Sequence, residues 1–398
     1  MKVYEKLLLN DNDTAFYLFD AAELKRRIFR LRSMLPEETA LCFAVKANPF
    51  LVRELTDCVD RFEICSPGEA MICRSLNVPK NRMVISGVYK TPTQVRGLLS
   101  DPYFNGVITV ESVRQYRLIG EFAQRFKRRA VVLLRLTNKS QFGLNKTEIE
   151  QIISQRGRNP RISVAGLQFF SGTQKTSIKK IRRELEELDL FLLRLKEVFG
   201  YEATELEYGP GFPVPYFDGD PFDEGEYLRE FSALLSGMHN KPKLTLELGR
   251  SIAASCGRYY THIVDIKQND GQDYLITDGG MHQLVYYGQQ MAMKQPAVRV
   301  VGKENAEPEA SWNICGALCS MNDILAKQIM LPAVQVGDVL CFENTGAYCM
   351  TEGISLFLSR ELPAVWMRPE YGAPFPIRMP VETYLYNTPS YERMRSDD

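Results

Sequence analysis

The feature of this sequence that most limits its fold is a regular alternation of short apolar runs with longer amphipathic segments. Apolar runs with little internal alternation are typical of strands buried on both faces of a parallel sheet. The segments between them, such as SIKKIRRELEELDLFLLRLKEVFGY, carry apolar residues at helical spacing. Eight such runs lie between residue 40 and Arg250, namely TALCFAVKA, FEICS, RMVISG, GVITVE, AVVLLRLT, ISVAGLQFF, ATELEYG and KLTLELG. Eight strand–helix units in succession predict an α/β protein with a (β/α)8 TIM barrel, and a doubly wound open sheet is the alternative.

The pattern changes after Arg250. The segment RYYTHIVDIKQNDGQDYLITDGG predicts two strands joined by a polar turn at Asp270-Gly271. Later runs such as PAVRVVG, DVLCFENT and PAVWMRP are short, rich in strand-forming residues, and bounded by glycine or proline. We therefore expect a barrel domain over residues 19–250. A mostly antiparallel β domain should occupy residues 251–398, with residues 1–18 adding a strand to it.

Charge and composition exclude several classes of protein. The 49 basic residues balance 49 acidic ones, so the chain lacks the basic excess that is typical of nucleic-acid binders. No apolar run approaches the ~20 residues that span a bilayer, and the three-leucine run near the start is too short for a signal peptide. The 9 cysteines form no C-x-x-C pair and the 3 histidines lie far apart, which argues against a disulfide framework and against a metal site. We expect a cytoplasmic protein that binds neither nucleic acid nor membranes.

Chemically useful residues follow the predicted strands at their carboxyl ends, where barrel enzymes have their active sites. Burial of Lys46, in FAVKANPF, would lower the pKa of its amine, as a Schiff-base lysine requires. EYGPGF offers a glycine loop for a phosphate, and ELGRS places Glu247 three positions before Arg250. A carboxylate facing a pyridinium nitrogen and an arginine near a phosphate would complete a pyridoxal phosphate site. Each feature alone also has an ordinary structural explanation, such as a lysine or an ion pair at the rim of the barrel.

Taken together, these motifs resemble those of the fold-type III pyridoxal phosphate decarboxylases, the diaminopimelate, ornithine and arginine decarboxylase family. Eleven motifs occur in family order along nearly the whole chain: FAVKAN, FEICSPGEA, VISGVYK, VES, QFGL, GLQFFSGTQ, EYGPGF, ELGRS, DGGMH, ICGALCSMND and TGAY. The resemblance implies an alanine racemase-like barrel with a second β domain, and the cofactor pyridoxal 5′-phosphate. It also implies a homodimer with shared active sites, in which Cys319 of one protomer reaches the cofactor of the other.

The resemblance further assigns roles to single residues. Lys46 resembles the lysine that binds the cofactor and later moves a proton, and Glu247 resembles the acid that pairs with the pyridine nitrogen. Cys319 resembles the thiol that protonates the substrate carbon after CO2 has left. Arg135 is expected to contact the substrate, and Glu63 matches a family position. The expected phosphate ligands are Thr173, Gly209, Gly211, Arg250 and Tyr348, while the remaining cysteines, Cys65 among them, are expected to be packing residues.

Three departures from the family pattern bear on cofactor and substrate. Phe170 replaces the second histidine of GLHxHxGSQ; its ring can stack on the cofactor's pyridine but forms no hydrogen bond. Pro210 in EYGPGF removes one N–H donor to the phosphate. Ser320 follows Cys319 where decarboxylases of free diamino acids have an acid that holds the distal ammonium, whose desolvation a hydroxyl cannot offset. We therefore expect Ser320 to contact the distal end of a modified amino acid.

Two branches of the family fit that expectation. One is similar to the siderophore decarboxylases of a citryl-linked diaminopropionate, and the other resembles the butirosin-pathway enzyme that acts on a glutamyl group of a carrier protein. Three alternatives stay open. The first is a decarboxylase of free diaminopimelate or another basic amino acid. The second is a racemase, although racemases of this fold pair the nitrogen with arginine; the third is an inactive homologue that only binds the cofactor.

Overall fold

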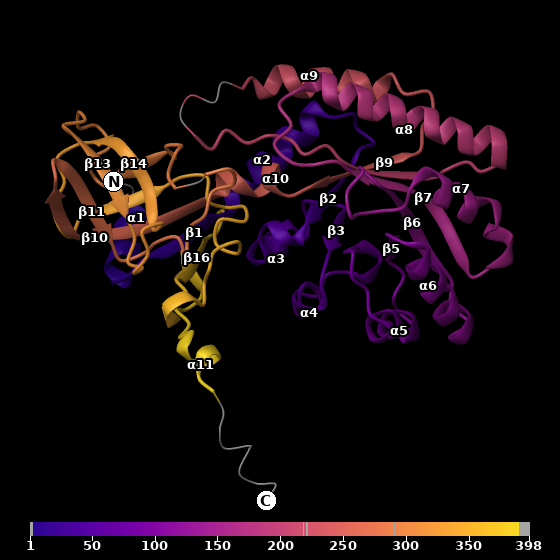
Figure 1. The fold of residues 1–398 in the computed structure, drawn as a ribbon, viewed down its shortest axis with the longest axis horizontal. Helices are drawn as coiled ribbons and strands as arrows, with labels where there is room; N and C mark the ends of the chain where they lie inside the picture. The colour runs from indigo at the N-terminus through magenta and orange to yellow at the C-terminus, as the bar shows by residue number, and fades with distance from the viewer. Residues whose placement is uncertain (1–2, 218, 220–221, 290, 390–398) are drawn as a thin grey trace, which may run out of the picture. The chain divides into compact units, whose positions relative to one another are not determined.

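The computed structural model describes residues 3–217, 219, 222–289 and 291–389 (Figure 1). The chain forms two compact units. The sheet unit comprises Met1–Leu24, Pro215–Pro221 and Ala253–Asp398, and the barrel unit comprises Lys25–Val214 and Phe222–Ile252. Residues 390–398, which we assigned to the second domain, lie outside the described residues.

The barrel unit contains a closed barrel of parallel strands in chain order, as the apolar runs predicted. Its strands are β2 Ala40–Ala44, β3 Arg61–Ile64, β4 Met83–Ile85, β5 Val107–Val110, β6 Ala130–Leu136, β7 Ile162–Phe170, β8 Glu205–Gly209 and β9 Lys243–Leu248. The last strand, β9, pairs with the first, β2, and so closes the barrel. The carboxyl ends of all these strands meet at one end of the barrel, which is where the functional site is expected.

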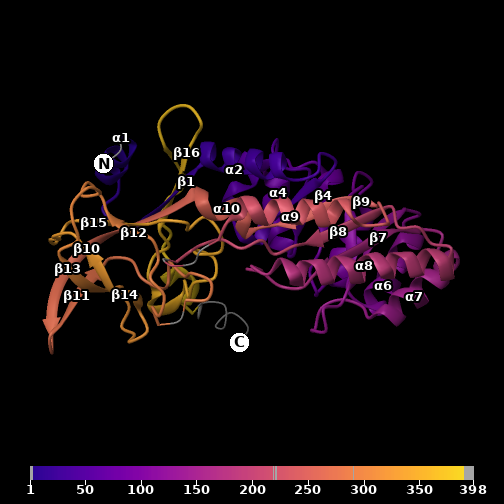
Figure 2. The same ribbon diagram turned by 90° about the horizontal axis from the view of Figure 1, so that it is seen from above.

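Helices surround these strands (Figures 1 and 2). They are α2 Ala21–Met34, α3 Val52–Leu55, α4 Pro67–Ser75, α5 Pro92–Ser100, α6 Val113–Arg125, α7 Lys146–Ser154, α8 Ile178–Phe199, α9 Glu224–Ser236 and α10 Arg250–Ala253, with 3-10 turns η1 Val45–Ala47, η2 Pro49–Leu51, η3 Lys80–Arg82 and η4 Arg156–Arg158. The hydroxyls of Ser66, Thr91 and Ser112 cap α4, α5 and α6 by accepting a backbone N–H three residues on. Gly200 ends α8 in the left-handed conformation, which a glycine adopts without strain.

The sheet unit is built on a 9-stranded sheet in which most pairings are antiparallel. Its strands are β1 Phe16–Asp20, β10 Gly257–Asn269, β11 Gln272–Thr277, β12 Val298–Val300, β13 Ala310–Cys315, β14 Ile324–Leu331, β15 Val339–Phe342, β16 Ala364–Arg368 and β17 Phe375–Arg378; α1 Val3–Asp11, η5 Ala254–Cys256, η6 Phe357–Ser359 and α11 Tyr384–Asn387 complete the unit. The N-terminal strand β1 pairs antiparallel with β10 and parallel with β16. Asp270 and Gly271, both with positive φ, form the predicted turn between β10 and β11.

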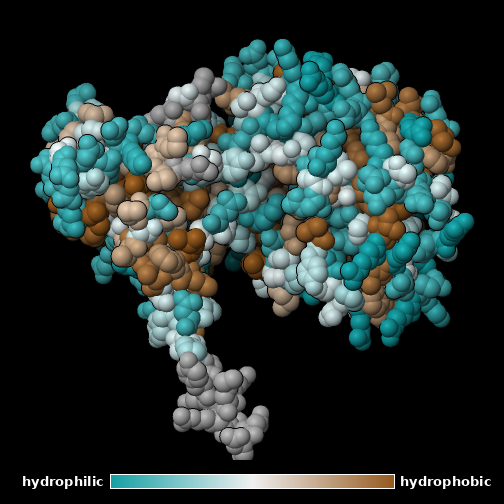
Figure 3. Space-filling model, viewed as in Figure 1, coloured by the Kyte–Doolittle hydropathy of each residue, from teal (hydrophilic) through white to brown (hydrophobic). Residues whose placement is uncertain are grey.

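The sheet unit has an exposed apolar patch. Apolar side chains gather on the sheet unit next to α11 (Figure 3). Around η6, Ile354, Leu356, Phe357 and Leu358 are each between 44% and 51% exposed. Among the described residues, no helix is both long and apolar enough to cross a membrane.

Candidate active site

Lys46 lies just beyond the carboxyl end of β2, in the turn η1. Its ammonium donates a hydrogen bond to Glu63 and lies 3.6 Å from Oε1 of Glu247. Glu63 is on β3 and Glu247 is on β9, the two strands that pair with β2. Three neighbouring strands thus bring one amine and two carboxyl groups together at the end of the barrel where (β/α)8 enzymes carry out their chemistry.

The two carboxyl groups have different electrostatic surroundings. Burial alone would raise the pKa of Glu63, but the charge of Lys46 and hydrogen bonds from Cys65 and Lys46 hold it below its usual value. Burial and the nearby charge of Glu63 raise the pKa of Glu247 to about 7, against the opposing effects of Lys46 and Arg135. Carboxyl groups that share a site titrate apart in this way. Glu63 is therefore the ionised partner of Lys46, and Glu247 exchanges a proton near neutral pH.

Gln168 orients Glu247, and the sequence analysis did not single it out. Its amide nitrogen donates to Oε2 of Glu247 at 2.9 Å, which leaves Oε1 directed toward Lys46. Gln168 is almost fully buried on β7, two residues before Phe170. Because alternate residues of a strand share a face, the expected position of Phe170 at the barrel end was a usable signal for Gln168.

The loops after β7 and β8 touch each other through glycine. Gly211 has a φ of +63°, and a Cβ there would lie 2.0 Å from the carbonyl oxygen of Gly172. A Cβ on Gly209 would lie 2.5 Å from the ring of Phe170. Thr173 belongs to the β7 loop that Gly211 contacts. Only glycine allows this approach, and loops with unobstructed backbone N–H groups are well suited to bind a phosphate.

The two remaining phosphate-ligand candidates lie in different units. Arg250 begins α10 directly after β9 and is 6% exposed. Tyr348 is half-buried in the sheet unit and has a φ of +65°, an uncommon backbone conformation for a tyrosine. Both roles stay predictions.

Arg135 is held by the barrel itself. On β6, its guanidinium pairs with Glu111 at 2.9 Å and lies over the ring of Phe142, 4.8 Å from the ring centroid. The arrangement fixes the guanidinium near the carboxyl ends of the strands, while its contact with the substrate stays a prediction.

Cys319 and Ser320 lie in the loop between β13 and β14 of the sheet unit. The carboxylate of Asp323 braces this loop by accepting the N–H groups of Leu318 at 2.7 Å and Met281 at 2.6 Å. The Cys319 side chain is exposed and Ser320 is half-buried. An exposed thiol on a braced loop is compatible with the expected contribution to a partner's site, and that contribution stays a prediction.

Cys65 does more than pack, contrary to our expectation. Its thiol donates to Oε1 of Glu63 at 3.0 Å and lies 3.5 Å from the Lys46 ammonium. The thiol therefore belongs to the lysine–carboxylate cluster. Its place at the end of the run FEICS, two residues after Glu63, was the signal for this position.

Glu207 is a further interior acid that the sequence analysis missed. It is fully buried on β8, and within the described part of the chain neither carboxyl oxygen has a hydrogen-bond partner. Burial, with the charges of Glu247 and Glu205 adding to it, raises its pKa well above the usual value. Burial therefore favours the protonated form of this side chain. Its position two residues before Gly209 places it on the same strand face, which alternation predicts.

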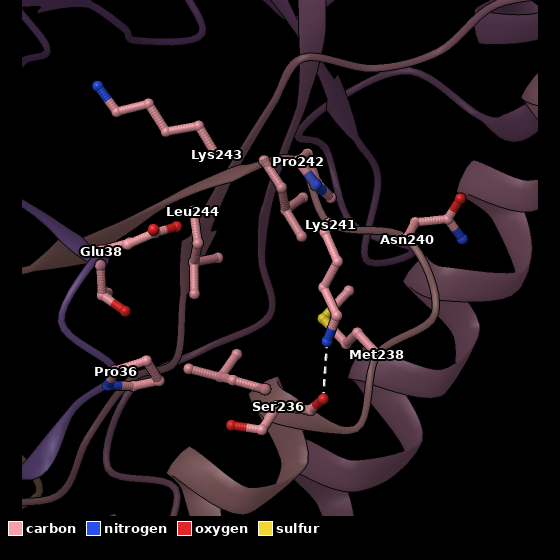
Figure 4. Close-up of a pocket in the computed structure, with 12 residues that line it drawn as sticks. Pro36, Glu38, Ser236, Met238, Asn240, Lys241, Pro242, Lys243 and Leu244 are labelled. Atoms are coloured by element: carbon pink, nitrogen blue, oxygen red, sulfur yellow. Dashed lines mark hydrogen bonds between the residues drawn. The ribbon is translucent and has the colours of Figure 1, made fainter.

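A pocket of about 660 Å³ lies at the opposite end of the barrel. Figure 4 shows the side chains that line it. Its lining includes Thr39, which precedes β2, and Lys243, which begins β9. Lys241 donates to the carbonyl oxygen of Ser236 at 2.7 Å. None of the predicted site residues lines this pocket.

The residues at the carboxyl end fit pyridoxal 5′-phosphate. They provide an amine, a buried carboxyl group that titrates near neutrality, and a glycine cradle that any Cβ would fill. Over the described ranges, no group of three or more histidine, cysteine, aspartate or glutamate side chains is arranged to hold a metal ion.

Fold and site together define a (β/α)8 enzyme with a lysine–carboxyl centre and an accessory β-sheet unit. The chain matches the family described as pyridoxal-dependent decarboxylase, C-terminal sheet domain, over residues 16–346, and therefore belongs to the pyridoxal-dependent decarboxylases. This is the ornithine, diaminopimelate and arginine decarboxylase family that the motifs indicated.

Named relatives cover most of the chain. It is 25% identical to a diaminopimelate decarboxylase of Aquifex aeolicus (84% of this chain, 82% of that protein). It is 26% identical to the L-glutamyl-[BtrI acyl-carrier protein] decarboxylase of Niallia circulans (88% of each). It is 24% identical to the 2-[(L-alanin-3-ylcarbamoyl)methyl]-2-hydroxybutanedioate decarboxylase of Staphylococcus aureus (91% and 96%). The same fold occurs in the diaminopimelate decarboxylase of M. jannaschii, with a TM-score of 0.83 and 23% identity over 95% and 92% of the chains.

Proposed function

We propose that this chain binds pyridoxal 5′-phosphate at the carboxyl end of the barrel and decarboxylates an amino acid whose distal end is modified or tethered to a carrier protein. When bound, this cofactor withdraws electrons from the α-carbon of the amino acid, so that CO2 can leave. The cluster of Lys46, Glu63 and Glu247 carries the first part of this proposal, because it places a nucleophilic amine beside a buried acid.

Each residue of the cluster has a task. Lys46 holds the cofactor aldehyde covalently and moves protons at Nζ. Glu63 keeps the amine in place through its hydrogen bond. Glu247, oriented by Gln168, keeps a proton on the pyridine nitrogen, and Phe170 offers an apolar ring beside Gly209 that excludes water. Arg250, Thr173 and Tyr348 are the proposed further phosphate ligands.

Ser320 carries the proposal about the substrate. A hydroxyl cannot replace a carboxylate as partner of a desolvated ammonium, so a free diamino acid would lose its distal contact. The names of two relatives point in the same direction, since one acts on a glutamyl group of an acyl-carrier protein and the other on an alanine linked to a hydroxybutanedioate. We infer that the distal contact in this chain is made to a neutral or acidic group.

Assembly and location are part of the proposal. The exposed apolar side chains around η6 favour contact with a second copy, because such patches mark interaction surfaces. A homodimer would also give the exposed Cys319 a partner cofactor to reach. Nine free thiols support a cytoplasmic location, where cysteines stay reduced.

A product assay tests the proposed function. The chain is reconstituted with pyridoxal 5′-phosphate and given free diaminopimelate, ornithine, lysine and arginine, a citryl-linked diaminopropionate, and a carrier protein bearing a glutamyl group. CO2 release and product chirality are measured, with K46A as the inactive control. We expect kcat/KM for a modified or tethered substrate to exceed that for any free diamino acid by about 100-fold.

Other results would identify the alternatives. Preference for a free diamino acid would overturn the role of Ser320. Inversion without CO2 would identify a racemase. Cofactor binding without turnover of any substrate would identify an inactive homologue.

Cys319 can be tested separately. C319A should lower kcat about 100-fold and leave cofactor binding intact, because a positioned proton donor contributes roughly that much to a rate. Steady-state kinetics and the isotope pattern of the product in D2O measure the effect. C58A, which removes a half-buried thiol far along the chain from this loop, is the control. Unchanged kinetics and product in C319A would contradict the assignment.

A further inference from the structure

A buried ion pair lies next to the glycine loops and was not assigned any role by the motifs. The ammonium of Lys175 donates to Oε2 of Glu184 at 2.7 Å, and the two side chains are only 3% and 11% exposed. The same ammonium donates to the hydroxyl of Ser171 at 3.0 Å, and the hydroxyl of Tyr208 donates to Oε2 of Glu184 at 2.7 Å. Lysine and glutamate are almost never buried to this extent unless they are paired. Their pairing explains how both can be buried, and their place beside the glycine loops suggests what the pair does.

Lys175 joins the loop after β7 to the loop after β8. Its backbone N–H donates to the carbonyl oxygen of Gly211 at 2.9 Å, and its Cε would lie 3.1 Å from a Cβ on that glycine. The preceding residue, Gln174, forms two more bonds between the loops: its amide nitrogen donates to the Val214 carbonyl at 2.9 Å, and its amide oxygen accepts the Val214 N–H at 2.7 Å. The two segments proposed to surround the phosphate are thereby held at a fixed spacing.

Helices α8 and α9 also contact Lys175. Glu184 is on α8, and the hydroxyl of Tyr227 on α9 donates to the Lys175 carbonyl at 2.7 Å. The Lys175 ammonium also lies 5.4 Å from the ring centroid of Tyr208 on β8. One residue thus anchors the β7 loop to two helices and to the neighbouring strand.

Energetics indicate that the pair supplies geometry rather than net stability. Removing two charges from water costs several kcal/mol, which their attraction roughly returns, so a buried ion pair is a weak source of stability. Burial would raise the pKa of Glu184, but hydrogen bonds from Lys175, Ser171 and Tyr208 hold it below the usual value, so the carboxyl stays ionised at neutral pH. The carboxylate of Glu184 therefore balances the ammonium charge of Lys175. The pair can affect a bound ligand by fixing the positions of the two loops, and not by its net charge.

We propose that Lys175 is a positioning residue for the phosphate group of the cofactor: paired with Glu184, it holds the two glycine loops at the spacing that binds a phosphate. This inference rests on the proposed binding of pyridoxal 5′-phosphate and adds how this chain holds its phosphate site. Pro210 has no N–H to donate, so the remaining donors of the two loops carry the contact. Holding such donors in place before the ligand arrives strengthens binding.

The test compares two ligands that differ only in the phosphate, pyridoxal 5′-phosphate and pyridoxal. Their dissociation constants are measured on the cofactor-free full chain, as wild type and as the double variant K175M/E184Q. Both charges are removed together, so neither is left buried alone, and the new amide can accept from Tyr208 through its oxygen and donate to the Ser171 hydroxyl through its nitrogen. We expect the dissociation constant of pyridoxal 5′-phosphate to rise about tenfold or more, and that of pyridoxal to change by less than about twofold.

A matched control lies at the other end of β8. Arg61 and Glu205 form a second pair of low exposure, with side chains 17% and 9% exposed. R61M/E205Q should leave the ratio of the two dissociation constants unchanged, and thermal unfolding reports what each double variant loses in stability. Should K175M/E184Q fail to fold, K175R keeps the charge but alters the geometry, and should weaken pyridoxal 5′-phosphate binding alone by about threefold.

The outcomes separate this inference from the proposed function. An equal loss of affinity for both ligands would show that the pair only supports the fold, and would overturn the inference. So would an unchanged affinity for pyridoxal 5′-phosphate. If the wild-type chain binds neither ligand, the proposed function has failed and the inference with it, whereas a wild type that binds and a variant that binds equally well refutes the inference alone.

Discussion

The two ends of the barrel differ in what they bury. The amino end has the pocket of about 660 Å³, but its lysines are exposed or bonded to backbone, as Lys241 is to Ser236. At the carboxyl end, Lys46 lies between two buried carboxyl groups, and one of these has a pKa raised to about 7. The carboxyl end is thus marked by contact between groups whose pKa values are shifted. Perturbed ionisable groups that lie in contact are the better guide to chemistry.

Strand β8 shows the change from one end to the other along a single element. Glu205 at its amino end pairs with Arg61, Glu207 two residues on lies without a hydrogen-bond partner within the described residues, and Gly209 at the carboxyl end has no side chain at all. The strand face passes from a neutralised charge through an unpaired acid to an open backbone. A structural ion pair at Glu205 and the proposed phosphate-binding backbone at Gly209 are therefore only four residues apart on one strand.

The largest difference between the two ends of the barrel is expected when a lysine of each end, Lys46 or Lys241, is replaced. K46A should lose the yellow absorbance of lysine-bound cofactor and lower activity by about 1000-fold or more, because it removes the amine that lies beside Glu63 and Glu247. K241A, at the amino end, should change neither. Absorbance spectra and CO2 release measure both variants, and a K46A protein that keeps the absorbance band would refute the assignment of Lys46.

A carboxyl group from each end gives the next largest contrast. E247Q should lower kcat about 100-fold while the cofactor still binds, since an amide does not keep the pyridine nitrogen cationic. E38Q removes an exposed carboxylate that lines the pocket at the amino end, and should leave kcat unchanged. Equal kinetics of E247Q and wild type would mean that the acid near neutrality has no part in the reaction.

The smallest effect is expected from Glu207, between the two ends. A carboxyl group whose pKa is higher in the folded chain than in the unfolded chain holds an extra proton when folded, so the free energy of unfolding falls as pH rises above about 4.5. E207Q removes this dependence, and the drop in the free energy of unfolding from pH 5 to pH 8 should shrink by about 1–3 kcal/mol. Urea denaturation of cofactor-free protein at both pH values measures it, with E38Q as control. The same pH dependence in E207Q and wild type would show that Glu207 is ionised in the fold.

Much of the barrel could be predicted because each strand is an unbroken apolar run, and the alternation of the runs with amphipathic segments was visible in the sequence. The positions of Lys46 and Glu247 followed from strand ends and motifs. Strand ends and alternation also indicated the positions of Gln168, Cys65 and Glu207, but not their roles, because these depend on which neighbour a side chain meets across the barrel.

The lysine–glutamate cluster shows the same limit. Lys175 and Glu184 are 9 positions apart in the sequence, and nothing in their local pattern predicts that both are buried against Tyr208. Side chains that act on one another through the interior become recognisable only when the closed barrel gives them a common environment.

The closure of the barrel by β9 against β2 has a consequence for how the protein matures. Lys46 follows the first strand of the barrel and Glu247 lies on the last, so the two meet only when every intervening strand has taken its place. During synthesis Lys46 leaves the ribosome long before Glu247, so their contact can form only late. The complete lysine–carboxyl centre would then exist only in a chain whose whole barrel has closed, and a nascent chain that stopped before its final strand would lack it.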